Sequence, residues 1–64
     1  MTVEFRDKKG DYIKQWPYWN GEIPQKGDTV VIHFGDINEE SIEYDVLYRK
    51  ISGTDPDKVI VMIE

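Results

Sequence analysis

The sequence contains no cysteine, and this absence excludes several classes of small protein. Disulfide-stapled secreted scaffolds and zinc knuckles both depend on cysteine side chains. His33 is the single histidine, so a metal cluster built on several histidines is excluded as well. We therefore expect a protein without a metal site or any other cofactor.

Long apolar runs are also missing. No run reaches the roughly 18 to 20 residues that a membrane-spanning helix needs. The first ten residues, "MTVEFRDKKG", lack the apolar segment of a signal peptide. These two absences predict a soluble, cytoplasmic protein that does not enter a membrane.

Positive charge is scarce in the second part of the chain. Residues 27–64 carry three cations against nine anions, whereas residues 1–26 carry five against four, and the net charge is −5. Binding to a phosphate backbone depends on lysine and arginine side chains that neutralise the phosphates. We therefore do not expect duplex nucleic acid to be a partner.

The chain nevertheless has the composition of a folded domain. Of its 64 residues, 39% are hydrophobic and 12% are aromatic, which supplies enough apolar surface to offset the entropy lost on folding. A core of this size rarely leaves a free energy of unfolding above roughly 3 to 5 kcal/mol. We expect residues 1–64 to form one small domain.

Short stretches of alternating apolar and polar residues are typical of β-strands. In chain order these stretches are "TVEFR", "DYIKQW", "TVVIHF", "IEYDVLYRKI" and "VIVMI". In the fourth stretch the consecutive apolar residues Val46 and Leu47 interrupt the alternation, which predicts a bulge there. Glycine and proline, or a preponderance of β-branched and aromatic residues, argue against a helix in every longer stretch. The pattern predicts an all-β fold, a small five-stranded antiparallel barrel of SH3-like type, with an OB-like barrel as the alternative.

One short motif supports this fold. Ile23, Pro24, Gly27, Asp28 and Val30 form the pattern I-P-x-x-G-D-x-V. The pattern resembles the start of a core strand in many small SH3-like barrel proteins, including uncharacterised ones from bacteria and phages. The resemblance covers eight residues and implies the fold, but it assigns no binding or catalytic residue.

Residues that could carry catalysis are few. We expect His33 on the solvent face of a strand, and both serines fall in turns without a nucleophile elbow. The stretch "DINEE" alternates oxygen-bearing side chains as a calcium loop does, but Ser41 stands at its sixth position and Leu47 at its twelfth. We expect a solvated turn there, no metal site, and a protein that is not an enzyme.

The stretch "PYWNGEIP", residues 17–24, gathers aromatic residues around an Asn-Gly pair, which is the signature of a type I′ hairpin turn. A hairpin about this pair places Tyr18 opposite Ile23. These two side chains then share one face of the hairpin, and Trp19 lies on the other. If Ile23 packs into the core, Tyr18 points inward and Trp19 is left outside. The pattern therefore predicts that Trp19 is available to a partner.

Two functions from different classes fit these features. The first is a non-enzymatic protein-interaction module with an aromatic patch inside an acidic rim, including an acidic inhibitor of the kind that some phages encode. Its candidate binding residues are Tyr12, Trp16, Tyr18, Trp19 and Tyr48. The alternative is a single-stranded nucleic-acid binder that stacks bases on Tyr12, Trp16 and Trp19. The cations expected to follow the phosphates are Arg6, Lys8, Lys9 and Lys14. The sequence does not identify the protein partner.

The last stretch, "VIVMI", is apolar on both faces of the expected strand. An exposed apolar edge strand tends to pair with another strand. We expect it either to be covered by the N-terminal strand and residues 17–24, or to form the seam of a homodimer.

Overall fold

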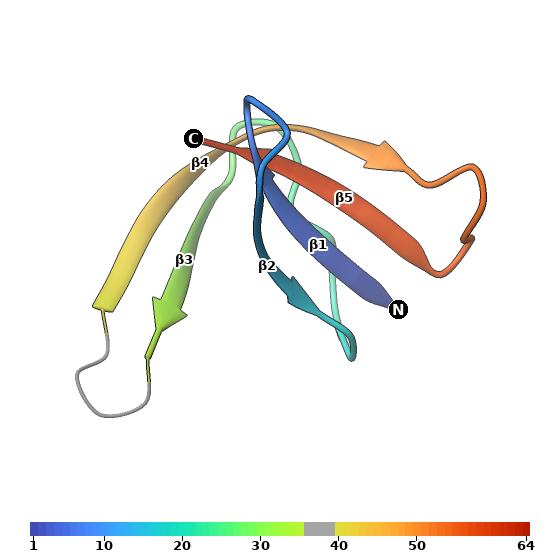
Figure 1. Cartoon of the computed structure of the whole chain (residues 1–64), viewed down its shortest axis with the longest axis horizontal. Helices are drawn as coiled ribbons and strands as arrows, with labels where there is room; N and C mark the ends of the chain where they lie inside the picture. The colour runs from blue at the N-terminus through green and yellow to red at the C-terminus, as the bar shows by residue number, and fades with distance from the viewer. Residues whose placement is uncertain (36–39) are drawn as a thin grey trace.

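A computed structural model of the chain shows five β-strands joined by turns and loops (Figure 1). It describes residues 1–35 and 40–64. The strands are β1 (Thr2–Asp7), β2 (Tyr12–Trp16), β3 (Thr29–Phe34), β4 (Glu40–Ile51) and β5 (Lys58–Ile63). The described residues contain no helix, so the prediction of an all-β fold is confirmed. Most of the predicted turn around "DINEE" lies outside the described residues.

The strands form one sheet in the order β2-β1-β5-β4-β3, which curls into a half-barrel with β2 and β3 at its two edges (Figure 1). Most neighbours are antiparallel, but β1 and β5 run parallel, with Val3 beside Val59 and Phe5 beside Val61. The prediction of a purely antiparallel barrel was wrong on this point. Alternation within a strand carries no information on its direction, which depends on which strands become neighbours in the sheet.

β5 lies between β1 and β4, and this position explains its lack of a polar face. Val59, Val61 and Ile63 point into the core, whereas Met62 is buried on the opposite face of the sheet. Of the arrangements expected for this strand, the structure shows pairing with the N-terminal strand. Both backbone edges of β5 are therefore occupied within one chain.

A bulge in β4 allows the sheet to curl. The first half of β4 pairs with β3 and the second half with β5, and the register shifts between Val46 and Tyr48. Bulges bend a strand and increase its twist. Figure 1 shows β4 curving from the β3 hairpin over to β5. The apolar pair at positions 46 and 47 predicted this bulge, and the structure confirms it.

The core occupies the concave face of the half-barrel. Burying an apolar side chain of this size contributes about 1.5 to 3 kcal/mol relative to leaving it in water. The buried cluster consists of Val3, Phe5, Ile32, Val46, Val59, Val61 and Ile63.

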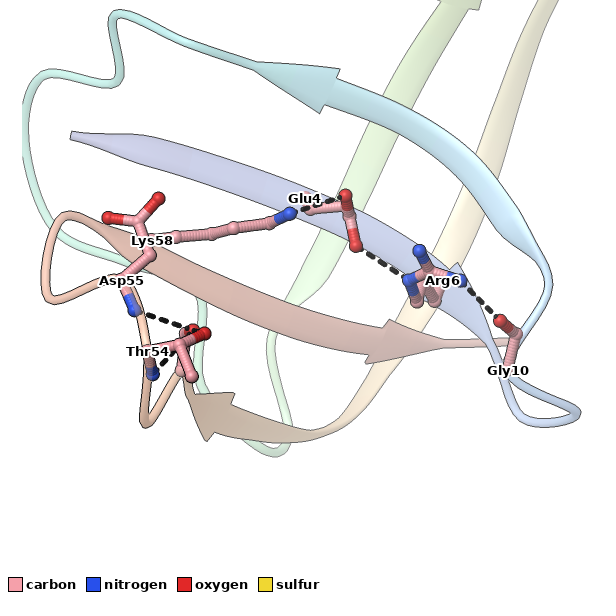
Figure 2. A network of polar contacts seen from close by, with 7 residues as sticks. Glu4, Arg6, Gly10, Thr54, Asp55 and Lys58 are labelled. Carbon is pink, nitrogen blue, oxygen red and sulfur yellow. Dashed lines mark hydrogen bonds and ion pairs between the residues drawn. The ribbon is translucent and has the colours of Figure 1, made fainter.

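Glu4 is a charged residue that lies buried on the outer face of β1, with 4% of its surface exposed. Its carboxylate accepts a hydrogen bond from Arg6 Nε at 2.6 Å and lies 3.0 Å from Lys58 Nζ. Figure 2 shows Glu4 between these two cations. Burial by itself raises the pKa of Glu4, but hydrogen bonds and charges from the two cations outweigh it. The pKa of Glu4 is therefore lowered.

Glu4→Gln is expected to lower the free energy of unfolding by about 1 to 2 kcal/mol at neutral pH, because the amide leaves two cations without a counter-charge. The folded pKa of Glu4 lies below its unfolded value. Its stabilisation is therefore present above the unfolded pKa and is lost as the pH falls through the folded pKa. Urea denaturation from about pH 7 down to about pH 3 checks this. The wild type should lose more stability than the variant, and equal losses would contradict the role of Glu4.

Candidate functional site

Residues 17–28 connect the two edge strands and cover part of the concave face. The Trp19 amide donates to the Met1 carbonyl at 2.9 Å, which ties this segment to the start of β1. At its other end, Val46 donates to the Asp28 carbonyl at 2.9 Å. Between these two ties, Ile23 packs against the core and Pro24 is buried. The segment is thus held at both ends and in the middle.

The hairpin predicted for residues 17–24 does not form. A type I′ turn requires a positive φ at both central residues. Gly21 has a φ of 110°, but Asn20 does not share it, since no described residue other than glycine has a positive φ. The segment is an irregular loop, so pairing across the Asn-Gly dipeptide does not decide which ring faces the core.

Trp19 faces the core and Tyr18 faces solvent, which is the reverse of the prediction. The Trp19 ring packs edge-to-face on Phe5, with centroids 6.0 Å apart and planes at 63°. Its Nε1 donates to the Glu22 carbonyl at 3.1 Å, so the polar end of the indole is satisfied. Tyr18 is 86% exposed. Trp19 is therefore a lid on the core.

An apolar groove of about 220 Å³ lies between β2 and β3, where the half-barrel stays open. No Cα atom of β2 lies within 8 Å of a Cα atom of β3, so the two edge strands are not paired with each other. The lining residues are Phe5 and Trp19, then Lys14, Gln15 and Trp16 of β2, and Val30, Val31, Ile32 and His33 of β3. The groove therefore follows both open strand edges.

Lys14 bridges this groove. Its Nζ donates to the His33 carbonyl oxygen at 2.7 Å and lies 5.8 Å from the centroid of the Phe34 ring. On the outer face of the β3–β4 pair, His33 Nδ1 and Ser41 Oγ are 2.7 Å apart. The two edges of the half-barrel are thus linked by a flexible side chain at this point.

The five aromatic residues predicted to bind a partner do not form one patch. Trp16, which is 52% exposed, and Trp19 line the groove, while Tyr18 lies beside them in the loop. Tyr12 and Tyr48 lie on the outer face of the sheet. The structure therefore brings two of the predicted residues together in the groove.

Val31 is a groove residue that the sequence analysis missed as a member of a binding site. Val31 is 53% exposed although it lies in the middle of β3. An apolar residue at an outward position of "TVVIHF" was the available signal. Lys14 was named only as a phosphate-contacting cation of the alternative function, and its place across the groove depends on the curl of the sheet.

Comparison with protein-family models, with curated proteins and with solved structures finds no match for this chain. Across residues 1–35 and 40–64, no group of three or more His, Cys, Asp or Glu side chains could hold a metal ion. The same part of the chain contains no helix with the length and apolar character needed to cross a membrane. The fold and the groove define a small β half-barrel with an open apolar seam.

Proposed function

We propose that this protein is a non-enzymatic protein-interaction module that binds a partner protein at the groove between β2 and β3. The observation that carries the proposal is the pair of half-exposed apolar side chains, Trp16 and Val31, beside an apolar groove. Tryptophan anchors carry a large share of the binding energy at protein interfaces. Contiguous apolar surface of this kind marks interaction sites on small proteins.

A rim of carboxylates lies on β4, one strand beyond the β3 wall of the groove. Glu43 lies directly opposite Val31 across the β3–β4 pair, and Asp45 lies opposite Thr29. Both acidic residues are exposed. Potentials at interfaces are arranged to be complementary, so this rim favours a basic partner surface. An acidic inhibitor that occupies a basic site on another protein fits the same arrangement.

Single-stranded nucleic acid is the second candidate, because Lys14 lies in the same groove as the exposed indole of Trp16. Two other cations considered for phosphate contacts already have acidic neighbours: Arg6 bonds to Glu4, and Lys8 Nζ lies 3.6 Å from a Glu64 carboxylate oxygen. These contacts and the net charge of −5 favour a protein partner.

Trp16→Ala is expected to weaken partner binding about 30-fold or more, because truncating a central interface tryptophan typically has an effect of this size. The free energy of unfolding should fall by less than about 1 kcal/mol, since half of the side chain already contacts water. A photocrosslinking aromatic amino acid at position 16, which keeps a ring at the groove, identifies the partner, and calorimetry of the wild type and of Trp16→Ala with that partner measures the affinity.

The matched control uses Tyr48, an aromatic residue on the outer face. A crosslinker at position 48 should not capture the same protein, and Tyr48→Ala should change the affinity by less than about twofold. If Trp16→Ala binds the captured partner as tightly as the wild type, the groove is not the binding site.

Titration with a single-stranded oligonucleotide at low salt separates the two functions. An interaction module leaves the fluorescence of its two tryptophans unchanged. A nucleic-acid binder changes it, and that binding weakens steeply as salt is added. A salt-sensitive fluorescence change would favour the second candidate.

A further inference from the structure

We infer that the partner binds as an added β-strand along the open edge of β3, and that this strand alternates apolar with basic side chains. The inference rests on the proposed function and specifies how the groove is used and by what chemistry. In this mode main-chain hydrogen bonds provide affinity, and alternate side chains provide specificity.

The backbone of β3 presents hydrogen-bonding groups to the groove. Lys14 Nζ reaches the His33 carbonyl from β2, so the His33 backbone faces the groove. Backbone groups of residues two apart in a strand point to the same side. The N–H and C=O of Val31 therefore face the groove as well, whereas those of Val30 and Ile32 face β4. Within the described residues β3 pairs with β4 alone, so this edge is open.

The edge of β3 also lacks the features by which edge strands usually avoid pairing. Proteins protect such edges with prolines, bulges, short length and inward-pointing charges. β3 is six residues long, contains no proline, aspartate, glutamate, lysine or arginine, and pairs with β4 without a register shift. The opposite edge, β2, is shorter, has a bulge in its pairing with β1 and is followed by Pro17. β3 is therefore the edge suited to receive a strand.

The groove suits the inward side chains of such a strand. Phe5, Trp19 and Ile32 contribute apolar surface next to the β3 edge. Side chains of a strand alternate between its two faces, so every second residue of the added strand points into this space. Apolar residues are therefore expected at those positions, and the flexible side chain of Lys14 has to give way.

The outward side chains of the added strand lie on the face of the sheet that carries the carboxylates of β4. Neighbouring strands are about 4.8 Å apart, so an added strand lies about 10 Å from β4 and its Glu43 and Asp45, within reach of lysine and arginine side chains. The whole chain carries a net charge of −5, which opposes pairing with a second copy and favours a basic strand. These charges select a basic partner over self-association.

The probe is a blocked heptapeptide that alternates lysine with valine or isoleucine. We expect it to bind the full chain and to slow hydrogen exchange at the amides of Val31 and His33 in NMR spectra. A version of the peptide N-methylated at alternate residues, which cannot donate to a strand edge, should bind about tenfold more weakly or worse. A version with glutamate in place of lysine should show no binding, and added salt should weaken the lysine peptide.

Val31→Pro tests the same edge from the protein side. Proline removes the N–H that faces the groove and leaves the hydrogen bonds to β4 in place, a position that edge strands tolerate. Peptide affinity should fall about fivefold or more. Val31→Ala is the matched comparison, because it also removes the valine side chain but keeps the N–H. Its peptide affinity should stay at least about threefold above that of Val31→Pro, and equal affinities would contradict a role of the N–H. The amide spectrum of each variant reports whether the fold is kept, and the N-methylated peptide tests the edge without any variant.

The possible outcomes separate this inference from the proposed function. Equal binding of the N-methylated peptide, or binding without protection of Val31, would overturn strand addition and leave groove binding in place. Absence of peptide binding up to about 1 mM, with a partner still captured at position 16, would overturn the assigned chemistry alone. Slow hydrogen exchange at the Val31 amide in a dimer formed without peptide would show that a second copy of the chain pairs with the β3 edge. That result would overturn the inference that the edge binds a basic partner strand.

Discussion

Trp19→Ala is expected to lower the free energy of unfolding by about 3 to 5 kcal/mol. The substitution removes the ring that packs edge-to-face on Phe5 and the Nε1 bond to the Glu22 carbonyl. The free energy of unfolding of a domain of this size rarely exceeds roughly 3 to 5 kcal/mol in total. Most of the variant should therefore be unfolded at room temperature, and circular dichroism with urea titration measures this.

The neighbouring residue provides the control for this prediction. Tyr18 is 86% exposed, so Tyr18→Ala should change the free energy of unfolding by less than about 0.5 kcal/mol. The sequence pattern by itself predicted the opposite ranking of these two rings. A stable Trp19→Ala variant together with an unfolded Tyr18→Ala variant would show that Tyr18 faces the core and Trp19 faces solvent, as the hairpin predicted.

Ile63→Ala is expected to destabilise the domain by about 2 to 5 kcal/mol. Ile63 is fully buried and lies directly opposite Val46 at the point where β4 bends. Because of the close packing at this bend, the surrounding side chains have little freedom to fill the cavity. The loss in free energy of unfolding should therefore lie in the upper part of the range for such truncations. Thermal unfolding followed by circular dichroism checks the result.

Ile60→Ala in the same strand is the matched comparison. Ile60 lies on the outer face and is only partly buried, so its truncation should cost about 1 kcal/mol. Similar losses at positions 60 and 63 would contradict the placement of the core on the concave face.

The position of Trp19 affects how binding experiments are designed. Trp19 and Phe5 belong both to the core and to the wall of the groove. Loss of binding in a Trp19 variant therefore follows from loss of the fold. Trp16 and Val31 are half-exposed in the same groove, so their variants report on binding with the fold intact.

The strands themselves could be predicted from the sequence. "TVVIHF" alternates without interruption and forms β3 at residues 29–34 as expected. Each of the other four predicted strands agrees with the structure to within two residues at either end. The apolar pair at positions 46 and 47 also indicated the bulge in β4. These features are local, because alternation, bulges and turns depend on residues a few positions apart.

Strand order, the parallel pairing of β1 with β5, and the facing of Trp19 depend on contacts between residues far apart in the chain. Trp19 faces inward because the Phe5 ring offers it a packing partner there and the Met1 carbonyl holds the loop, and neither partner is near it in sequence. The groove likewise exists because the curled sheet leaves β2 and β3 unpaired with each other. The sequence determined which residues form strands and that the chain is acidic. Only the tertiary structure decided which strand edge and which tryptophan remain open, because burial depends on what packs against a residue.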